Sequence, residues 1–209
     1  MTLATPLAQP SPDASPIVVD GLGHPVWLVR HAPTSWTGRR WCGRADPPLN
    51  GEGRTVARDL AATIHDAVAA IGIAPTMRSS PARRARATAA AVGRAGRWPI
   101  TVDDDLLEVD VGVAEGLTWA ELSERHPDLA AVIASGDRVN WPGGESVAAV
   151  HDRARRASER IVADAQARPV IVVSHGALLH AIVASMVVAP PTHFFAPGGI
   201  LPLVPAVGR

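Results

Sequence analysis

The 209-residue sequence predicts an α/β domain with three layers, in which helices cover both faces of a mostly parallel central sheet. Short, continuous apolar runs alternate along the chain with segments of helical periodicity. Continuous apolar runs are typical of parallel strands that are buried on both faces. Two of these runs end abruptly in polar pairs, Arg30-His31 and Ser174-His175. The length suits one such domain with a full core and is short for two.

The elements follow in order along the chain. A buried strand covers residues 26–29, and Asn50 caps a helix that continues to about Ile71, where apolar residues recur every three or four positions. Thr118 and Glu121 have the spacing of a capping box, which predicts a short helix. The other expected elements are strands at 76–79, 100–102, 170–173 and 200–204, helices at 81–93, 145–168 and 176–189, and a loop over 104–117.

The first residues differ in composition from the rest. Several prolines and small polar residues interrupt them, and they lack the basic start and continuous apolar run of a signal peptide. We therefore expect a flexible N-terminal extension over residues 1–24 and one domain over 25–209. No stretch reaches the roughly 18–20 apolar residues of a membrane span. A single cysteine, Cys42, cannot form an internal disulfide, so we expect a reducing, cytoplasmic location.

Composition excludes several kinds of chemistry. All 20 basic residues are arginine, and 20 acidic residues balance them to a net charge of zero. That balance offers no electrostatic basis for non-specific binding of nucleic acid or a membrane surface. The absence of lysine excludes a Walker-type phosphate loop and Schiff-base catalysis.

The two strand-end histidines indicate a site for an anionic substrate. Ligands of open α/β sheets bind beyond the carboxyl ends of the strands. A neutral imidazole is a nucleophile, and a neighbouring guanidinium disfavours its protonation and can hold phosphate oxygens. A single histidine of this kind is more often a buried ring with its hydrogen bonds satisfied, but two at equivalent strand ends, His31 and His175, make that interpretation less favourable.

Six sequence blocks in one order resemble the histidine phosphatase superfamily, whose members share the phosphoglycerate-mutase-like fold. Each block is weak alone, but the ordered set is specific and covers residues 26–180. The blocks are RHAPT at 30–34, GRADPPLN at 43–50, SSPARRARATA at 79–89, LE at 107–108 with EGLT at 115–118, GGES at 143–146 and SHG at 174–176.

The resemblance implies a role for each matching residue. His31 would be the nucleophile that takes the phosphoryl group, and His175 would complete the pocket. Arg30 and Arg84 would hold the phosphate oxygens, because a transferring phosphoryl group needs fixed positive donors. Glu108 would protonate the leaving alkoxide and later deprotonate the attacking water. No metal and no cofactor would be required.

The same blocks place Thr34, Thr37 and Gly43 among the substrate-binding residues. Thr37 stands where the family often has asparagine, so one hydroxyl donor replaces two amide donors. Ala32 replaces the usual glycine, which is tolerable at a negative φ but narrows the space beside the nucleophile. Ala114 replaces a family aromatic residue and loosens one wall.

Neighbouring residues offer competing assignments. Arg83 and Arg86 are near Arg84, but only Arg84 matches the arginine position of the family motif. We therefore expect Arg83 and Arg86 to be solvated helix residues. Glu115 is a second acid that the motif phase leaves structural, and His180 fits a helix face better than a substrate contact. The triplet at 103–105 imitates the DxD of aspartyl-phosphate phosphatases, most of which also need lysine. Cys42 cannot act as in tyrosine phosphatases, because C-x5-R would require arginine where Pro48 stands.

The resemblance favours a phosphatase of small phosphorylated metabolites, similar to the α-ribazole-phosphate and broad-specificity branches. A cofactor-dependent phosphoglycerate mutase and a catalytically silent relative that binds a phosphorylated ligand remain alternatives. Family mutases carry a longer insertion between the acid and the second histidine, whereas Glu108 and His175 lie 67 positions apart. A homodimer also remains open. Four tryptophans beside the mouth loops could stack on a substrate ring or pack the loops: Trp36, Trp41, Trp119 and Trp141.

Overall fold

A computed structural model describes residues 15–188 and 195–206 of the chain. Within these residues the strands are β1 (Ile17–Val19), β2 (Val26–Arg30), β3 (Thr76–Ser79), β4 (Ile100–Val102), β5 (Val170–Ser174) and β6 (Ile200–Pro205). The helices are α1 (Gly51–Ile71), α2 (Arg83–Gly96), α3 (Trp119–Arg125), α4 (Pro127–Ala134), α5 (Val147–Ala165) and α6 (Gly176–Met186).

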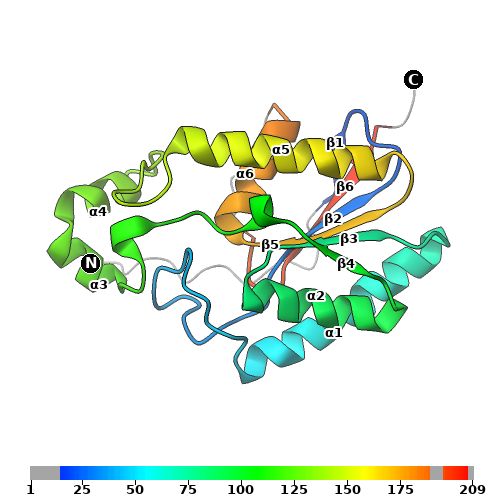
Figure 1. Cartoon of the computed structure of the whole chain (residues 1–209), viewed down its shortest axis with the longest axis horizontal. Coiled ribbons are helices and arrows are strands. Elements are labelled where there is room, and N and C mark those ends of the chain that lie inside the picture. The colour runs from blue at the N-terminus through cyan, green and yellow to red at the C-terminus, as the bar shows by residue number, and fades with distance from the viewer. Residues whose placement is uncertain (1–14, 189–194, 207–209) are drawn as a thin grey trace.

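The strands form one sheet in the order β1-β6-β2-β5-β3-β4. Strands β2, β5, β3 and β4 are mutually parallel, whereas β6 runs antiparallel to β2 and pairs in parallel with β1. Figure 1 shows α5 and α6 on one side of this sheet, α1 and α2 on the other, and α3 and α4 set apart at one end. The three-layer, mostly parallel α/β fold expected from the sequence is confirmed.

Alternation along the central strands explains why both faces are buried. Leu28 and Val172 pack on the side of α5 and α6, while Val29, Ile171 and Val173 pack on the side of α1 and α2. Successive residues of a strand point to opposite faces, so a strand covered on both sides must be apolar at every position. The continuous apolar runs in the sequence therefore correspond to the centre of the sheet.

Two predicted helix caps are present. The Asn50 side chain accepts a hydrogen bond from the Gly53 amide at 2.7 Å, which fixes the start of α1. Thr118 and Glu121 form both hydrogen bonds of a capping box at the start of α3. These caps anchor the segments that follow the 31–50 and 104–117 loops.

The expected N-terminal extension needs correction at its C-terminal end. Residues 1–14 lie outside the described residues, but Ile17–Val19 form β1, which pairs with β6 in the register Ile17↔Leu203. Val19 is buried, and Leu22 in the following turn also belongs to the core. A strand of three residues with Val18 exposed carries too little periodicity to be found in sequence, yet it covers the edge of β6. The domain therefore includes part of the segment 15–24.

Other boundaries differ by a few residues. Ser146 caps α5, so this helix begins at Val147 and not at 145. Helix α6 ends at Met186 and Val187 is extended, while residue 189 lies outside the described residues. Helix α4 was not expected, and two 3-10 turns interrupt the 104–117 loop. None of the helices in the described part of the chain is both long and apolar enough to cross a bilayer.

Candidate active site

Two neighbouring parallel strands bring the two histidines together. Strands β2 and β5 pair with Arg30 opposite Ser174, so the residues that follow them, His31 and His175, meet at the carboxyl edge of the sheet. Their ring centroids lie 5.1 Å apart with an interplanar angle of 62°. Both rings are buried. The sequence placed both histidines at strand ends on this edge of the sheet, and the pairing of β2 with β5 brings them next to each other.

The ring of His31 is held in one tautomer. Its Nδ1 lies 2.8 Å from the carbonyl oxygen of Ala32, which can only accept, so Nδ1 carries the hydrogen. The lone pair is then on Nε2. Burial, together with the charges of Arg84 and Arg30, lowers the pKa of His31 to about 3. The imidazole is therefore neutral at physiological pH and has the electronic form of a nucleophile.

Ala32 fits the position where the family usually has glycine. Among the described residues other than glycine, Arg97 alone has a positive φ, so the backbone at Ala32 suits any residue. Its methyl group is fully buried with Leu49 and Ala57, and its amide donates to the Thr88 hydroxyl at 3.0 Å. The methyl therefore packs into a small apolar cluster beside α1.

His175 stands immediately before α6 and is fully buried. Its Nε2 lies 2.8 Å from the hydroxyl oxygen of Ser80, whereas its Nδ1 is buried without a hydrogen-bond partner. Burial, followed by the proximity of His31 and three arginines, lowers the pKa of His175 well below its usual value. Ser80 was not singled out in sequence, although it belongs to the serine pair that opens the third motif block.

Arg30, the last residue of β2, lies against the start of α6. Its Nη1 donates to the Phe195 carbonyl at 2.5 Å, and its Nε is buried without a partner. A Cβ added at Gly176 would lie 3.4 Å from the guanidinium, so Arg30 packs directly against this glycine. Burial lowers the pKa of Arg30, and the nearby Glu108 carboxylate opposes that shift.

Arg84 is almost completely buried, at 1% exposure, whereas its neighbours Arg83 and Arg86 are exposed. Its guanidinium donates to the carbonyls of Ala45 at 2.6 Å and Gly43 at 2.9 Å, and its Nε has no partner. The burial pattern agrees with the motif phase that selected Arg84. Gly43 is thus in direct contact with the arginine that the sequence placed in the pocket.

Glu108 lies beside the N-terminal turn of α6. Its Oε1 accepts from the Leu178 amide at 3.2 Å and from the Val109 amide at 2.9 Å. A carboxylate at a helix N-terminus is stabilised by the unpaired backbone N–H groups there. Within the described residues no backbone amide donates to Oε2, so one oxygen orients the group and the other is left without a backbone donor.

Glu115, the competing acid, is fully used by the backbone. Its carboxylate accepts from the Gly43 amide at 3.0 and 3.2 Å and from the Arg44 amide at 2.6 Å. A Cβ at Gly43 would lie 2.4 Å from the Val109 carbonyl oxygen, so only glycine fits this close approach. These contacts hold the loop whose carbonyls bind Arg84 and agree with a structural role for Glu115.

Thr34 and Thr37 close a turn after the nucleophile. The Thr37 hydroxyl accepts from the Thr34 amide at 2.9 Å and lies 3.3 Å from the Thr34 hydroxyl. The Thr34 hydroxyl also accepts from the Trp36 amide at 3.2 Å. These bonds are internal to the turn, and the substrate-binding roles of both threonines stay predictions.

Tryptophans pack the mouth loops against one another. The Trp41 ring lies 5.4 Å from that of Trp141 and 6.5 Å from that of Trp119, centroid to centroid. Trp41 and Trp141 also pack on a small core of Val111, Ala114 and Leu122. The packing interpretation therefore accounts for two of the four residues. Trp119 remains exposed, with its ring beside that of Trp41.

Within residues 15–188 and 195–206, no three His, Cys, Asp or Glu side chains are grouped so that they could hold a metal ion. The candidate residues are instead two arginines, two neutral histidines and one glutamate, contributed by the ends of β2 and β5, by α2 and by the 104–117 loop. The guanidinium groups of such a set match the oxygens of an anion.

The family model of the histidine phosphatase superfamily (branch 1) matches residues 26–199. The chain therefore belongs to this superfamily, as the ordered motif blocks indicated. A bifunctional protein of Mycobacterium tuberculosis is 40% identical over 149 residues, which cover 71% of this chain and 40% of that relative. The chain thus spans less than half of the length of that relative.

Similar proteins include both phosphatases and mutase-like proteins. The uncharacterized phosphatase PhoE of Bacillus subtilis is 30% identical over 77% of this chain and 76% of its own length. A probable phosphoglycerate mutase of Salmonella newport is also 30% identical, over 79% and 75%. Among solved structures, a mycobacterial glucosyl-3-phosphoglycerate phosphatase superposes with a TM-score of 0.71 at 27% identity, covering 86% of this chain and 89% of that one.

Proposed function

We propose that the protein is a phosphomonoesterase that hydrolyses a small phosphorylated metabolite through a phosphohistidine at His31, without a metal ion. The observation that carries the proposal is a set of unpaired buried nitrogen atoms. Within the described residues, Arg30 Nε, Arg84 Nε and His175 Nδ1 are all buried without a hydrogen-bond partner. A buried polar group without a partner costs about 1–3 kcal/mol, so three such groups need a physical reason, which we assign to the binding of an anionic ligand.

A phosphoryl group fits those donors in both charge and geometry. Besides burial, the charges of Arg30 and Arg84 both help to lower the pKa of His31 and of His175, so the two guanidinium groups lie near both rings. Among the described residues, the carboxylate nearest to either guanidinium in an ion pair is Asp46, at 3.8 Å from Arg84. Two positive charges with little internal neutralisation are what a phosphate dianion requires.

The first step transfers the phosphoryl group to His31. The lone pair on Nε2 attacks phosphorus, the bond from phosphorus to the ester oxygen breaks, and Glu108 gives its proton to the departing alkoxide. Arg30 and Arg84 neutralise charge on the equatorial oxygens, and the Nδ1–H of His175 donates a hydrogen bond to one of them. We place the hydrogen of His175 on Nδ1 because Ser80 Oγ already accepts from the Ala82 amide at 3.3 Å and its own hydrogen can then be donated to His175 Nε2.

The second step regenerates the enzyme. Ionised Glu108 takes a proton from water, the water oxygen attacks phosphorus, and the bond to Nε2 breaks with its electron pair returning to the imidazole. Inorganic phosphate then leaves, and Arg30 and Arg84 keep the charge that they had at the start of the cycle. His31 needs no external base in either step, because burial and the two arginines already keep it neutral.

The mutase alternative differs in what happens to the phosphohistidine. A mutase returns the phosphoryl group to the substrate and excludes water, whereas the segment between Glu108 and His175 is short. The silent alternative is disfavoured because the nucleophile, both arginines and the acid are present together. The substrate alcohol would meet the loops at 36–44, 104–120 and 136–146, which set the specificity.

The proposal is tested by phosphate release from p-nitrophenyl phosphate and a panel of phosphorylated metabolites, with and without EDTA. We expect turnover that EDTA does not change and that His31→Ala abolishes. His65→Ala is the matched control. His65 lies on α1 and stacks on Trp98, so this variant should retain full activity. Strict dependence on a divalent ion would contradict the mechanism. Isomerisation of 3-phosphoglycerate faster than phosphate release would favour the mutase.

A further inference from the structure

We infer that Arg153, on α5, is the positioning residue for Glu108 and that Glu145 holds Arg153 in place. The inference rests on the proposed role of Glu108 as the proton donor. Neither residue was singled out as functional in sequence, although Glu145 lies in the GGES block. The signal in the sequence was an arginine at helical spacing with the apolar face of α5, four positions before Ala157.

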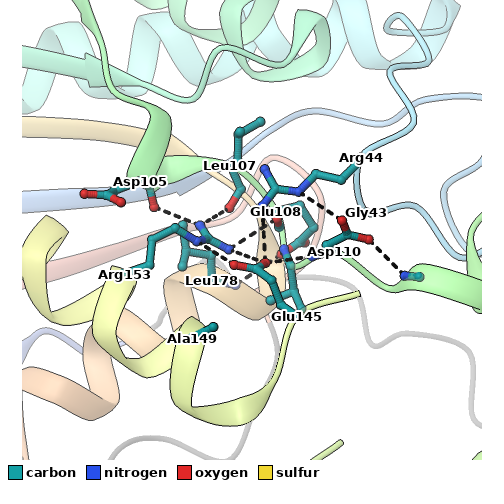
Figure 2. Close-up of polar contacts among 12 residues, drawn as sticks. Gly43, Arg44, Asp105, Leu107, Glu108, Asp110, Glu145, Ala149, Arg153 and Leu178 are labelled. Atoms are coloured by element: carbon teal, nitrogen blue, oxygen red, sulfur yellow. Dashed lines mark hydrogen bonds and ion pairs between the residues drawn. The ribbon is translucent and has the colours of Figure 1, made fainter. Parts of the chain in front are cut away.

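Arg153 is buried at 7% exposure and donates to three backbone carbonyls of the segment that carries Glu108. Its Nη1 lies 2.6 Å from the Leu107 carbonyl and 2.9 Å from the Asp105 carbonyl, and its Nη2 lies 3.4 Å from the carbonyl of Glu108 itself. Figure 2 shows the guanidinium between these carbonyls and Glu145. One planar group therefore sets the backbone on both sides of the Glu108 Cα.

Glu145 fixes the orientation of that group. Its two oxygens accept from Arg153 Nε at 3.0 Å and Nη2 at 2.8 Å, which is a bidentate pair. The same carboxylate accepts from the Asp110 amide at 2.8 Å, and the Glu145 amide donates to the Asp110 carbonyl at 2.9 Å. The segment is thus held before Glu108 by Arg153 and after it by Glu145. Burial would raise the pKa of Glu145, but the bonds from Arg153 and Asp110 lower it, so it stays ionised.

The network also reaches the loop that binds Arg84. Arg44 Nη2 lies 3.3 Å from Glu145 Oε2, as Figure 2 shows, and the residues on either side of Arg44 supply the carbonyls that hold Arg84. A Cβ at Gly144 would lie 2.3 Å from the Asp110 carbonyl, so the 142–145 turn is packed directly against the acid segment. Glu145 therefore contacts both the segment that carries Glu108 and the loop that holds Arg84, whereas Arg153 hydrogen-bonds only the Glu108 segment and Glu145 within the described residues.

A buried ion pair is by itself weak evidence for stability, since its desolvation offsets much of its attraction. Arg153 instead donates three hydrogen bonds to the backbone carbonyls around the side chain of Glu108. Within the described part of the chain, the Glu108 side chain accepts hydrogen bonds only from the backbone amides of Leu178 and Val109. A displacement of about 1 Å at a reacting group can cost about 100-fold in rate. Loss of Arg153 should therefore appear as loss of proton transfer.

The test measures the single-turnover rate of phosphoryl transfer to His31 from an alkyl phosphate and from p-nitrophenyl phosphate. The alkoxide needs a proton to leave, whereas p-nitrophenolate does not. The variants are Arg153→Lys and Arg153→Gln, alone and combined with Glu108→Gln. Arg156→Gln is the matched control, because Arg156 lies on the same helix and pairs with the Asp105 carboxylate at 2.7 Å but reaches none of the three carbonyls.

We expect Arg153→Gln to slow transfer from the alkyl phosphate by roughly 10- to 100-fold and from p-nitrophenyl phosphate by less than about 3-fold. Arg156→Gln should change neither rate. In the Glu108→Gln background, Arg153→Gln should add almost nothing, because the two residues act on one step. If Arg153→Gln does not fold, Arg153→Lys keeps the charge opposite Glu145 and should show a smaller loss with the same substrate dependence.

Equal losses on both substrates would overturn the inference, as would a full additional loss in the Glu108→Gln background. Glu108→Gln alone separates this failure from failure of the proposed mechanism. If Glu108→Gln shows no preference between the substrates, Glu108 is not the acid and the proposed mechanism fails. If it shows the preference but Arg153→Gln does not, only the inference about Arg153 fails.

Discussion

The buried, neutral His31 should make the protein less stable in mild acid. Its pKa is about 3 in the folded protein, against 6.5 for an ordinary histidine. As the pH falls below 6.5 the unfolded chain binds a proton that the folded state does not, so protonation favours unfolding. The stability linked to this group is therefore fully present above pH 6.5 and is lost progressively as the pH falls toward 3.

The magnitude follows from the difference in pKa. One proton taken up only by the unfolded state costs about 1.4 kcal/mol per pH unit, so acidification from pH 7 to pH 4 should cost about 3 kcal/mol through His31. Burial makes this site poorly screened by solvent, so little discount applies. A typical domain is stable by about 5–15 kcal/mol, which makes the loss readily measurable.

The assay is urea unfolding at a series of pH values for the wild-type protein and His31→Asn. Asparagine can keep the hydrogen bond to the Ala32 carbonyl but has no proton to gain. Between pH 6 and 4, the free energy of unfolding should fall about 1.4 kcal/mol per pH unit less steeply in the variant than in the wild type. Parallel curves would refute the account of His31 as a neutral, buried base.

Three further expectations concern other parts of the site. Arg84→Lys should raise KM and lower kcat because lysine cannot make the paired contacts of the guanidinium to the Gly43 and Ala45 carbonyls, whereas Arg86→Lys should match wild type in steady-state kinetics. Gly144→Ala should lower the free energy of unfolding by about 1–3 kcal/mol, because the new Cβ would lie 2.3 Å from the Asp110 carbonyl oxygen. Gly51→Ala is the control and should leave the free energy of unfolding unchanged, because the nearest atom to its Cβ is 3.9 Å away. Equal losses in the two variants would contradict the close-packing argument. Thr118→Ala should cost about 1 kcal/mol in denaturant unfolding through loss of the capping box, and no change would mean that α3 is held by packing alone.

The sequence predicted the parts of the fold in which local signals agree with tertiary packing. The apolar runs of β2 and β5 and the caps at Asn50 and Thr118 are of this kind. The prediction did not find β1, because a three-residue strand is specified by its partner β6 and not by its own pattern. Helix α4 was missed for a similar reason, since most of its residues are small or exposed and little apolar periodicity marks it.

The same distinction, between local sequence signals and tertiary contacts, applies to the residues of the site. The motif phase selected Arg84 over Arg83 and Arg86, and burial agrees with that choice. Contacts to backbone carbonyls leave no pattern in the sequence, so the link from Arg153 to the Glu108 segment required the structure. The position of Ser80 beside the ring of His175 likewise depends on the pairing of β3 with β5.

The central claim is that His31 carries the phosphoryl group, and rapid quenching with labelled substrate tests it most directly. Wild-type protein is mixed in excess with a radiolabelled phosphate ester, quenched in alkali within the first turnover, and mapped by peptide. We expect label on His31 that is stable to alkali and released by acid, with longer-lived label in Glu108→Gln and none in His31→Ala. Full turnover with no labelled histidine at any time, or label that persists in His31→Ala, would contradict the account.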